Sequence, residues 1–227
     1  MFGVDYSFAP HPSPAALTAA GVRFACRYIS ADAGNDGNGK NLRPAEARAL
    51  LAAGIAVVMV AESYAARMKE GRPAGVADAQ HANAVVQALG MPGVPVYFAA
   101  DWDAQPADQP AINAYLDGAA SVIGRQRTGI YGGYRPVKRA LDAGKASYAW
   151  QTVAWSAGVW DPRAHIHQGL AVTIGGVQCD RDESRRPDFG QWPRPGVTVP
   201  RPAPAPAPAP TPPAPGQATG TGPCRGA

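Results

Sequence analysis

The chain has 227 residues, of which 46% are hydrophobic and 17% are charged, and this composition is enough for a packed globular core. The formal net charge of +4 includes Arg194, Arg201 and Arg225, which lie in residues 193–227, where no acidic residue occurs. Residues 1–192 therefore hold 18 basic and 17 acidic groups, a net charge of +1, which argues against a nucleic-acid-binding domain. No apolar run is long enough to cross a membrane.

Apolar runs and helical patterns alternate along the first half of the chain. Ser13 and Pro14 provide an N-cap and a proline at the first position of a helix, and Gly21 ends that helix. Pro44 opens a second helix, which Gly54 closes. The strands that flank these helices are expected at residues 2–6, 22–29 and 55–61.

The second half of the chain continues this alternation and completes a set of eight strands. Eight strands with mostly helical crossovers predict an α/β fold, a compact (β/α)8 TIM-like barrel over residues 1–192. An open doubly wound sheet is the alternative, but it predicts a glycine-rich phosphate loop after the first strand, where the chain reads SFAPHPSP. Helices are expected at residues 74–90, 108–123 and 135–142, and strands at residues 94–100, 128–131, 147–152, 164–168 and 176–179, with little helix between the last two strands.

Residues 193–227 differ in composition from the rest of the chain. They contain 12 of the 24 prolines, and residues 200–215 read PRPAPAPAPAPTPPAP. An alternating Pro-Ala tract adopts extended polyproline II and cannot bury a core, so we predict a disordered, flexible tail or linker that acts as a spacer. The barrel domain is therefore expected to end at residue 192.

Acidic residues recur where the predicted strands end. In a barrel of this kind the C-terminal ends of the strands form one mouth, and catalysis takes place there. Crowded carboxylates of like charge cost stability, so a ring of them indicates a function. The five candidate catalytic residues are Asp5, Glu62, Asp101, Asp103 and Asp180.

The segment VPVYFAADWD contains the sharpest of these signals. Residues i and i+2 of a strand face the same way, about 6.5 to 7 Å apart, so Asp101 and Asp103 are expected to present two carboxylates to one ligand. This separation suits the acid pair of glycoside hydrolysis, in which one carboxyl group keeps its proton. An Asp-x-Asp pair also suits a divalent cation, and an exposed acidic turn is the remaining alternative.

Aromatic and polar side chains accompany the acids at the predicted mouth, and aromatic faces of this kind stack on sugar rings. The candidate substrate-binding residues are Tyr6, Arg27, Tyr28, Tyr131, Trp150, Gln151 and Gln168. Further aromatic residues near the same strand ends and loops are Tyr64, Tyr97, Trp102, Trp155 and Trp160. His165 and His167 have strand spacing, but no third ligand is indicated, so we predict no metal ion and no cofactor.

Eight segments between residues 3 and 192 resemble one known family. In chain order they read GVDYS, FACRYIS, KNLRPAEARALLAAGI, YFAADWD, GIYGGY, WQTVAWS, HIHQ and CDRDE with FGQW after it. Together they resemble the glycoside-hydrolase-like domain of unknown function that occurs in actinobacteria and phages, a TIM barrel similar to the family 25 lysozymes. The resemblance implies this fold for essentially all of residues 1–192.

The family 25 lysozymes cleave the β-1,4 bond after N-acetylmuramic acid in peptidoglycan, and their fourth strand carries Asp-x-Glu. The resemblance implies that Asp101 is the stabilising Asp, Asp5 the first-strand acid and Asp180 the last-strand acid. Asp103 stands where the family has its catalytic Glu, and the missing methylene draws the carboxyl group back by about 1.5 Å. Three alternatives stay open: Asp103 is the acid of a reshaped site, Glu62 replaces it, or the barrel binds glycan without cutting it.

We therefore predict a glycoside hydrolase that acts on peptidoglycan or another cell-envelope glycan without a metal. The alternative is a non-catalytic glycan-binding or structural module of the envelope or of a phage particle. The expected partner is a glycan, with no nucleic acid and no membrane span, and the expected state is a monomer. The start MFGVDYSF has no signal-peptide pattern, so an extracellular or cell-wall location implies another export route or a signal removed before this numbering begins.

Overall fold

Eight strands close into a barrel in this structure, a computed structural model that describes residues 1–31 and 39–196. Each strand pairs with the next along the chain, and the last pairs with the first to complete the circle. The predicted α/β barrel is therefore confirmed. The strands are β1 (Phe2–Asp5), β2 (Phe24–Tyr28), β3 (Ala56–Ala61), β4 (Val96–Ala100), β5 (Thr128–Gly132), β6 (Tyr148–Thr152), β7 (Ile166–Ile174) and β8 (Val177–Ser184).

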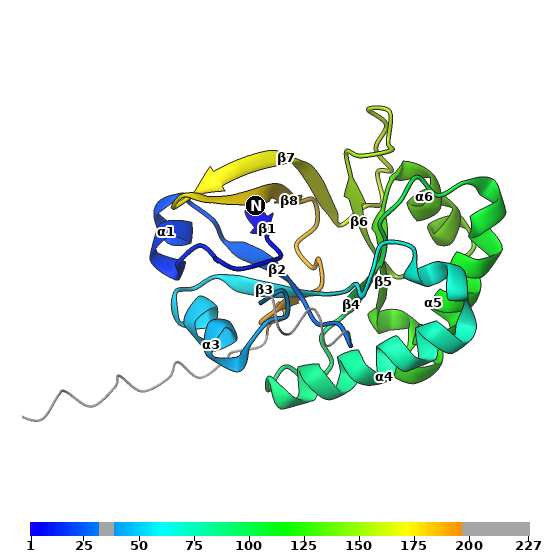
Figure 1. Cartoon of the computed structure of the whole chain (residues 1–227), viewed down its shortest axis with the longest axis horizontal. Helices are drawn as coiled ribbons and strands as arrows, with labels where there is room; N and C mark the ends of the chain where they lie inside the picture. Colours follow the sequence, from blue (N-terminus) through cyan, green and yellow to red (C-terminus); the bar gives the residue numbers. More distant parts are fainter. Residues whose placement is uncertain (32–38, 197–227) are drawn as a thin grey trace, which may run out of the picture.

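Helices cover the outside of the barrel (Figure 1), with α4, α5 and α6 on one side and α1 and α3 on the other. The predicted helix start at Ser13 is confirmed, because its hydroxyl accepts a hydrogen bond from the Ala16 amide at 3.1 Å. The α-helices are α1 (Pro14–Ala19), α3 (Pro44–Ala52), α4 (Arg72–Ala88), α5 (Gln109–Ile123) and α6 (Tyr134–Asp142), and the short 3-10 helices are η1 (Arg67–Glu70), η2 (Pro106–Asp108) and η3 (Arg125–Arg127).

The last two barrel strands form a hairpin, which differs from the expected succession of parallel strands. β7 and β8 are longer than predicted, run antiparallel, and turn at Gly175 and Gly176. Both glycines have positive φ angles, 58° and 81°, which side chains rarely adopt and which tight hairpin turns require. Because β8 runs opposite to β1, Asp180 reaches the mouth from the first half of its strand and pairs with Asp5.

The residues of each strand alternate between two apolar layers. One layer fills the barrel lumen and includes Val58, Tyr97 and Trp150, and the other lies between the barrel and the helices. A ninth strand, β9 (Gln191–Trp192), pairs with the first half of β3. The lumen is therefore filled with side chains from its N-terminal end up to the mouth.

The predicted tail over residues 193–227 lies outside the described residues from position 197 onward. The last described strand ends at Trp192. In the part of the chain that the structure describes, no helix is both long and apolar enough to cross a bilayer.

Gly75 of α4 and Gly118 of α5 let the backbones of these two helices come into contact. A Cβ atom added at Gly118 would lie 2.3 Å from the Arg72 carbonyl oxygen, and this backbone atom cannot move aside. We expect Gly118→Ala to lower the free energy of unfolding by about 1–3 kcal/mol, because overpacking forces the helices apart. Denaturant unfolding measures this, with Gly169→Ala as the control, since a Cβ there meets the Arg181 carbonyl oxygen at 3.6 Å. Equal stability of the two variants would contradict the close helix packing.

Candidate functional site

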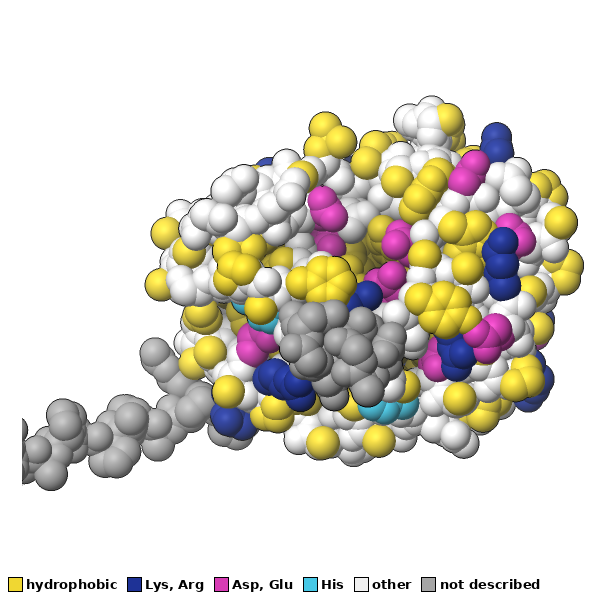
Figure 2. Space-filling view, viewed as in Figure 1, with side chains coloured by type: hydrophobic (Ala, Val, Ile, Leu, Met, Phe, Trp, Pro, Cys, Tyr) yellow, Lys and Arg dark blue, Asp and Glu magenta, His cyan; other side chains and the backbone are white. Residues whose placement is uncertain are grey.

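Acidic side chains converge on the barrel mouth from several strands. They follow the strand alternation, because Asp101 lies two residues beyond Ala99 of the lumen layer and Glu62 two residues beyond Val60. Tyr28 lies among these acids. Burial raises the pKa of its hydroxyl, and the negative charges of Asp5, Glu62 and Asp101 raise it further. Figure 2 shows acidic side chains around a hollow in the middle of one face. The polar residues on the lumen side at this end of the barrel are Asp5, Tyr28, Glu62, Asp101, Tyr131, Gln168, Asp180 and Asp182.

Asp5 and Asp182 form a buried carboxyl pair beneath the mouth. Asp5 is 3% exposed and Asp182 is fully buried. The Gln168 amide donates to Asp5 Oδ2 at 2.7 Å, and the Trp150 indole donates to Asp182 Oδ1 at 2.9 Å. The Asp5 carboxyl group and the Cys26 thiol also interact with the Asp182 carboxyl group.

The surroundings of this pair favour its protonated form. Burial raises the pKa of Asp5 to about 7, against the opposing hydrogen bond from Gln168. Burial, together with the charge of Asp5, raises the pKa of Asp182 well above its usual range. Two neighbouring carboxyl groups in an apolar lumen cannot both ionise at low cost, so they titrate as a coupled pair.

Gln168 connects the buried pair to the surface of the mouth. It donates to Asp5 and accepts a hydrogen bond from the Tyr131 hydroxyl at 2.8 Å. The same hydroxyl is within hydrogen-bonding reach of Asp101. Gln168 and Tyr131, from separate strands, therefore connect the buried pair to the neighbourhood of Asp101.

The three carboxyl groups of the mouth itself differ in their surroundings. Burial raises the pKa of Asp101, and the Lys40 ammonium and the Tyr131 hydroxyl oppose this rise. Burial raises the pKa of Asp180, and the charge of Asp101 raises it further. Burial also raises the pKa of Glu62, but Lys40 Nζ lies 3.0 Å from Glu62 Oε2 and opposes that rise. The pKa of all three groups is therefore raised, and Lys40 moderates the rise at Asp101 and Glu62 but not at Asp180.

The Asp103 side chain does not point the same way as the Asp101 side chain, because the chain turns between them. β4 ends at Ala100, and the Ala104 amide then donates to the Trp102 carbonyl oxygen at 2.7 Å, which turns the chain. The Asp103 side chain is exposed. The expected pairing of Asp101 with Asp103 requires strand geometry to continue past Ala100, and the turn removes that geometry.

Two predicted substrate-binding residues face away from the mouth. Arg27 is fully buried, and its guanidinium donates to both carboxylate oxygens of Glu46 in α3, at 2.7 and 3.2 Å. The Tyr6 hydroxyl donates to Glu46 at 3.1 Å, and Arg27 Cζ lies 4.3 Å from the centre of the Tyr6 ring. These contacts fix α3 against the barrel. Adjacent residues of a strand face opposite sides, and it is Tyr28 that takes the lumen side.

Trp150 and Gln151 are neighbours in β6, so their side chains face opposite sides of the strand. Trp150 is 1% exposed in the lumen, with its ring centre 4.6 Å from that of Tyr131. Gln151 is fully buried on the other side of β6, where it donates to the Val159 carbonyl oxygen at 2.7 Å and accepts from the Asp161 amide at 2.8 Å. Gln151 therefore shapes the loop after β6, and Trp150 supports the site from below.

Asp182 and Lys40 are site residues that sequence reasoning missed. The expected last strand ended at Cys179, so Asp182 lay outside it. The signal was present in the segment CDRDES, since Asp180 and Asp182 share one face of an extended strand. A longer strand in that prediction would have placed both acids in the barrel.

The histidines near the start of β7 have structural contacts. His165 Nδ1 accepts a hydrogen bond from the Ala149 amide at 3.2 Å. His167 stacks on Trp160 with ring centres 4.0 Å apart. Within residues 1–31 and 39–196, no group of three or more His, Cys, Asp or Glu side chains is placed to hold a metal ion.

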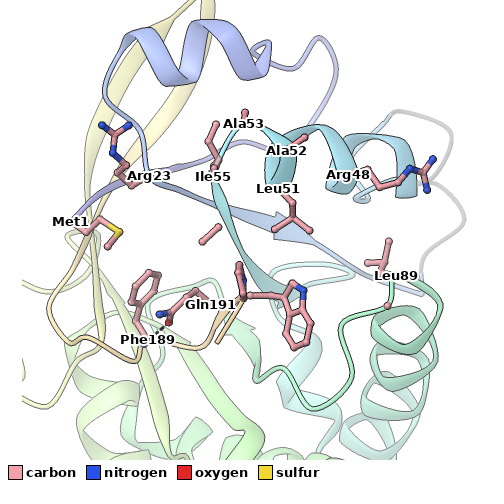
Figure 3. A pocket seen from close by; sticks show the side chains of 15 residues that line it. Met1, Arg23, Arg48, Leu51, Ala52, Ala53, Ile55, Leu89, Phe189 and Gln191 are labelled. Carbon is pink, nitrogen blue, oxygen red and sulfur yellow. Dashed lines mark hydrogen bonds between the residues drawn. The ribbon is translucent and has the colours of Figure 1, made fainter. Parts of the chain in front are cut away.

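A cavity of about 860 Å³ lies at the opposite end of the barrel (Figure 3). Its lining comes from the end of α3, the start of β3 and β9, and includes Leu51, Ile55 and Trp192. Apolar side chains, two arginines and Gln191 line it, with none of the carboxyl groups described above. The acidic mouth is therefore the candidate site, since the catalytic end of such a barrel is the C-terminal one.

The barrel and its acidic mouth define the class of glycoside-hydrolase-like domains. This chain belongs to the Rv2525c-like, glycoside hydrolase-like domain family, whose model matches residues 15–184. It is 34% identical over 203 residues to the Mycobacterium tuberculosis protein named "Putative peptidoglycan hydrolase Rv2525c". The matched region covers 83% of this chain and 82% of that protein. The predicted resemblance to a glycoside-hydrolase-like family is confirmed.

Solved structures agree with this family assignment. The crystal structure of the Mycobacterium tuberculosis Tat-secreted protein Rv2525c in complex with L-tartrate has a TM-score of 0.78 at 32% identity, covering 84% of this chain and 98% of that chain. The Clostridium perfringens spore cortex lytic enzyme SleM has a TM-score of 0.54 at 15% identity, covering 81% of this chain and 66% of that chain. At that identity the second structure shows a shared fold alone.

The buried carboxyl pair makes the stability of the fold depend on pH. Burial and the charge of Asp5 raise the pKa of Asp182 well above its ordinary value of 3.8, so between these two pKa values the folded chain holds a proton that the unfolded chain has released. The resulting stability is fully present below the lower pKa and is lost as pH rises through the higher one. Relative to Asp182→Asn, we expect the wild-type free energy of unfolding to fall across this range by up to about 1.4 kcal/mol per pH unit.

Denaturant unfolding at several pH values between about 4 and 8 measures this difference. Glu183→Gln is the matched control, because Glu183 is the next residue of the same strand but is exposed on the outer face. A difference between wild type and Asp182→Asn that stays constant with pH would argue against the shared proton.

Proposed function

We propose that this chain is a glycoside hydrolase of peptidoglycan or another cell-envelope glycan, with Asp101 and Asp180 as its reacting carboxyl pair. The observation that carries the proposal is that two carboxyl groups in one mouth have different neighbours. Burial raises the pKa of both, Lys40 and Tyr131 oppose that rise at Asp101, and the charge of Asp101 adds to it at Asp180. Glycoside hydrolysis uses two carboxyl groups whose surroundings push their pKa values apart.

In this proposal Asp180 donates its proton to the glycosidic oxygen as the bond from that oxygen to the anomeric carbon breaks. The Asp101 carboxylate stabilises the positive charge that develops on the sugar ring. A water molecule then bonds to the anomeric carbon and gives a proton to the Asp180 carboxylate, which restores the starting state. Each cleaved bond consumes one water molecule, and the residues named here are sufficient for every proton transfer.

The buried pair has a positioning role. Asp5 accepts from Gln168, and Gln168 in turn accepts from the Tyr131 hydroxyl, so the orientation of Tyr131 beside Asp101 depends on Asp5 and on the proton it shares with Asp182. Groups that orient a reacting side chain in this way determine how well it is aligned with the substrate. We therefore propose that Asp5 acts through Gln168 and Tyr131.

Glu62 and Lys40 flank the reacting pair. Lys40 Nζ lies 3.0 Å from Glu62 Oε2 and 4.6 Å from the centre of the Tyr28 ring. An ammonium held in this position favours the charge of Asp101, as its effect on the pKa of that group indicates. We propose that Glu62 and Tyr28 hold Lys40, and that Tyr28 also borders the bound sugar.

The proposal differs from the family 25 lysozymes in the identity of the acid. In those enzymes the acid follows the stabilising Asp by two residues, but here Asp103 is exposed beyond a turn. Asp180 reaches the same mouth from β8. Glu62 is the second candidate for the acid, and its ion pair with Lys40 counts against it.

The relatives support the choice of substrate and location. The name of the Mycobacterium tuberculosis relative refers to peptidoglycan hydrolysis, and its crystal structure is described as that of a Tat-secreted protein. We propose an extracellular or cell-wall location and a peptidoglycan substrate for this chain as well. A monomer remains our prediction for its oligomeric state.

We expect Asp101→Asn and Asp180→Asn each to lower the release of reducing ends from purified peptidoglycan by about 10²- to 10⁴-fold, because each removes one of the two carboxyl groups that move or balance charge. The assay measures reducing ends and the masses of the soluble products. Asp103→Asn separates this assignment from the lysozyme-like one, because we expect that variant to stay within about threefold of wild type.

Glu183→Gln serves as the control, since it removes an exposed carboxylate of the same strand as Asp180. Loss of activity in Asp103→Asn with activity retained in Asp180→Asn would transfer the acid role to Asp103. A wild-type chain that binds peptidoglycan but releases no reducing ends would favour the alternative function, a non-catalytic glycan-binding module.

A further inference from the structure

The loop between β6 and β7 has a strained backbone at two residues that are not glycine. Trp155 has a φ angle of 55° and Ala157 one of 49°. The left-handed region costs a residue with a side chain roughly 1–2 kcal/mol relative to the usual conformations, and glycine would avoid that cost. A tryptophan in this conformation is a feature that the surrounding structure must enforce.

Buried side chains enforce the loop conformation. The Ser156 hydroxyl donates to the Thr152 carbonyl oxygen at 2.6 Å and accepts from the Tyr134 amide at 2.8 Å. Gln151 donates to Ser156 Oγ at 3.1 Å and to the Val159 carbonyl oxygen at 2.7 Å. The conformation at Trp155 is thus set by Gln151 and Ser156 and does not depend on burial of the indole.

The Trp155 side chain remains 41% exposed, although large apolar side chains are normally covered. The other tryptophan of this loop, Trp160, stacks on His167 with its ring centre 4.0 Å away. Trp160 therefore has a packing role, whereas the strain at Trp155 holds a large ring at the surface.

Trp155 lies at the mouth of the barrel. It follows the C-terminal end of β6 by three residues, and its Cβ atom is 3.1 Å from the position that a Cβ would take at Gly133. Gly133 comes directly after β5, two residues beyond Tyr131. Since two strand residues span about 6.5 to 7 Å, the Cβ atom of Trp155 lies within about 10 Å of the backbone of Tyr131, whose side chain borders Asp101.

We propose that Trp155 is a stacking platform for a pyranose ring of a β-linked glycan strand, next to the ring that reacts at Asp101 and Asp180. This inference rests on the proposed function for the choice of ligand class. A pyranose has an apolar C–H face and a rim of hydroxyl groups, so it suits a site with an exposed indole beside carboxylates, which accept hydrogen bonds from hydroxyls. The platform contributes to binding, and it has no part in the proton transfers.

Co-sedimentation with purified, protein-free peptidoglycan tests this proposal. We expect Trp155→Gly to lower the association constant by about tenfold, since it removes the ring while relieving the backbone. Ala157→Gly is the matched control: it relieves the same kind of strain in the same loop, keeps the ring, and is expected to bind as wild type does. Trp155→Phe retains an aromatic face and is expected to restore most of the affinity.

Thermal unfolding of each variant accompanies the binding measurement, and Ala157→Gly is expected to raise the Tm by about 2–4 °C. Trp155→Asn is the second ring-free variant, because asparagine tolerates a left-handed backbone and keeps the loop folded. Wild-type affinity in Trp155→Gly and Trp155→Asn would overturn the proposal. An equal loss of affinity in Ala157→Gly would also overturn it, because loop conformation would then explain the effect.

The test separates this inference from the proposed function. If the wild type binds peptidoglycan through Trp155 but releases no reducing ends, the platform stands and the hydrolase fails. If the Trp155 variants bind and cleave as wild type does, the platform fails and the hydrolase stands.

Discussion

The burial of two neighbouring carboxyl groups, Asp5 and Asp182, in the barrel lumen is the constraint on which the mouth depends. β8 runs antiparallel beside β1, so Asp182 pairs with Gly3 and Asp180 with Asp5, which places one acid in the lumen and the other at the mouth. Two ionised carboxylates at the buried position would cost several kcal/mol, and a shared proton with donors from Trp150 and Gln168 avoids that cost. Gln168, which donates to Asp5, links this pair to Tyr131 at the mouth.

The alternation of side chains along each strand divides the polar residues into two sets with different functions. Tyr28 faces the mouth, while its neighbour Arg27 binds Glu46 and anchors α3 to the barrel. Gln151 likewise turns away from the lumen, toward the loop that follows β6. A fully buried guanidinium with a bidentate carboxylate partner is a structural group, because removing either partner would leave an unpaired buried charge.

The loops at the C-terminal end then add features that the strands do not provide. The turn after β4 exposes Asp103, and the loop after β6 holds Trp155 in a strained conformation beside the end of β5. Both loops are fixed by hydrogen bonds to backbone or buried side chains. The chemistry of the mouth therefore depends on rigid strands for its acids and on well-anchored loops for its surface.

The sequence by itself determined the order of strands and helices and four of the acids at the mouth, among them Asp180. Apolar runs, Ser-Pro helix starts and terminal glycines are local signals, Asp5 ends its strand, and Glu62 and Asp101 follow theirs directly. Only the tertiary structure decided the direction of β8 and hence the place of Asp182, the turn that removes Asp103, and the pairing of Arg27 with Glu46. The physical reason is that a strand direction, and the partner of a buried charge, depend on contacts between segments far apart in the chain, which no local pattern records.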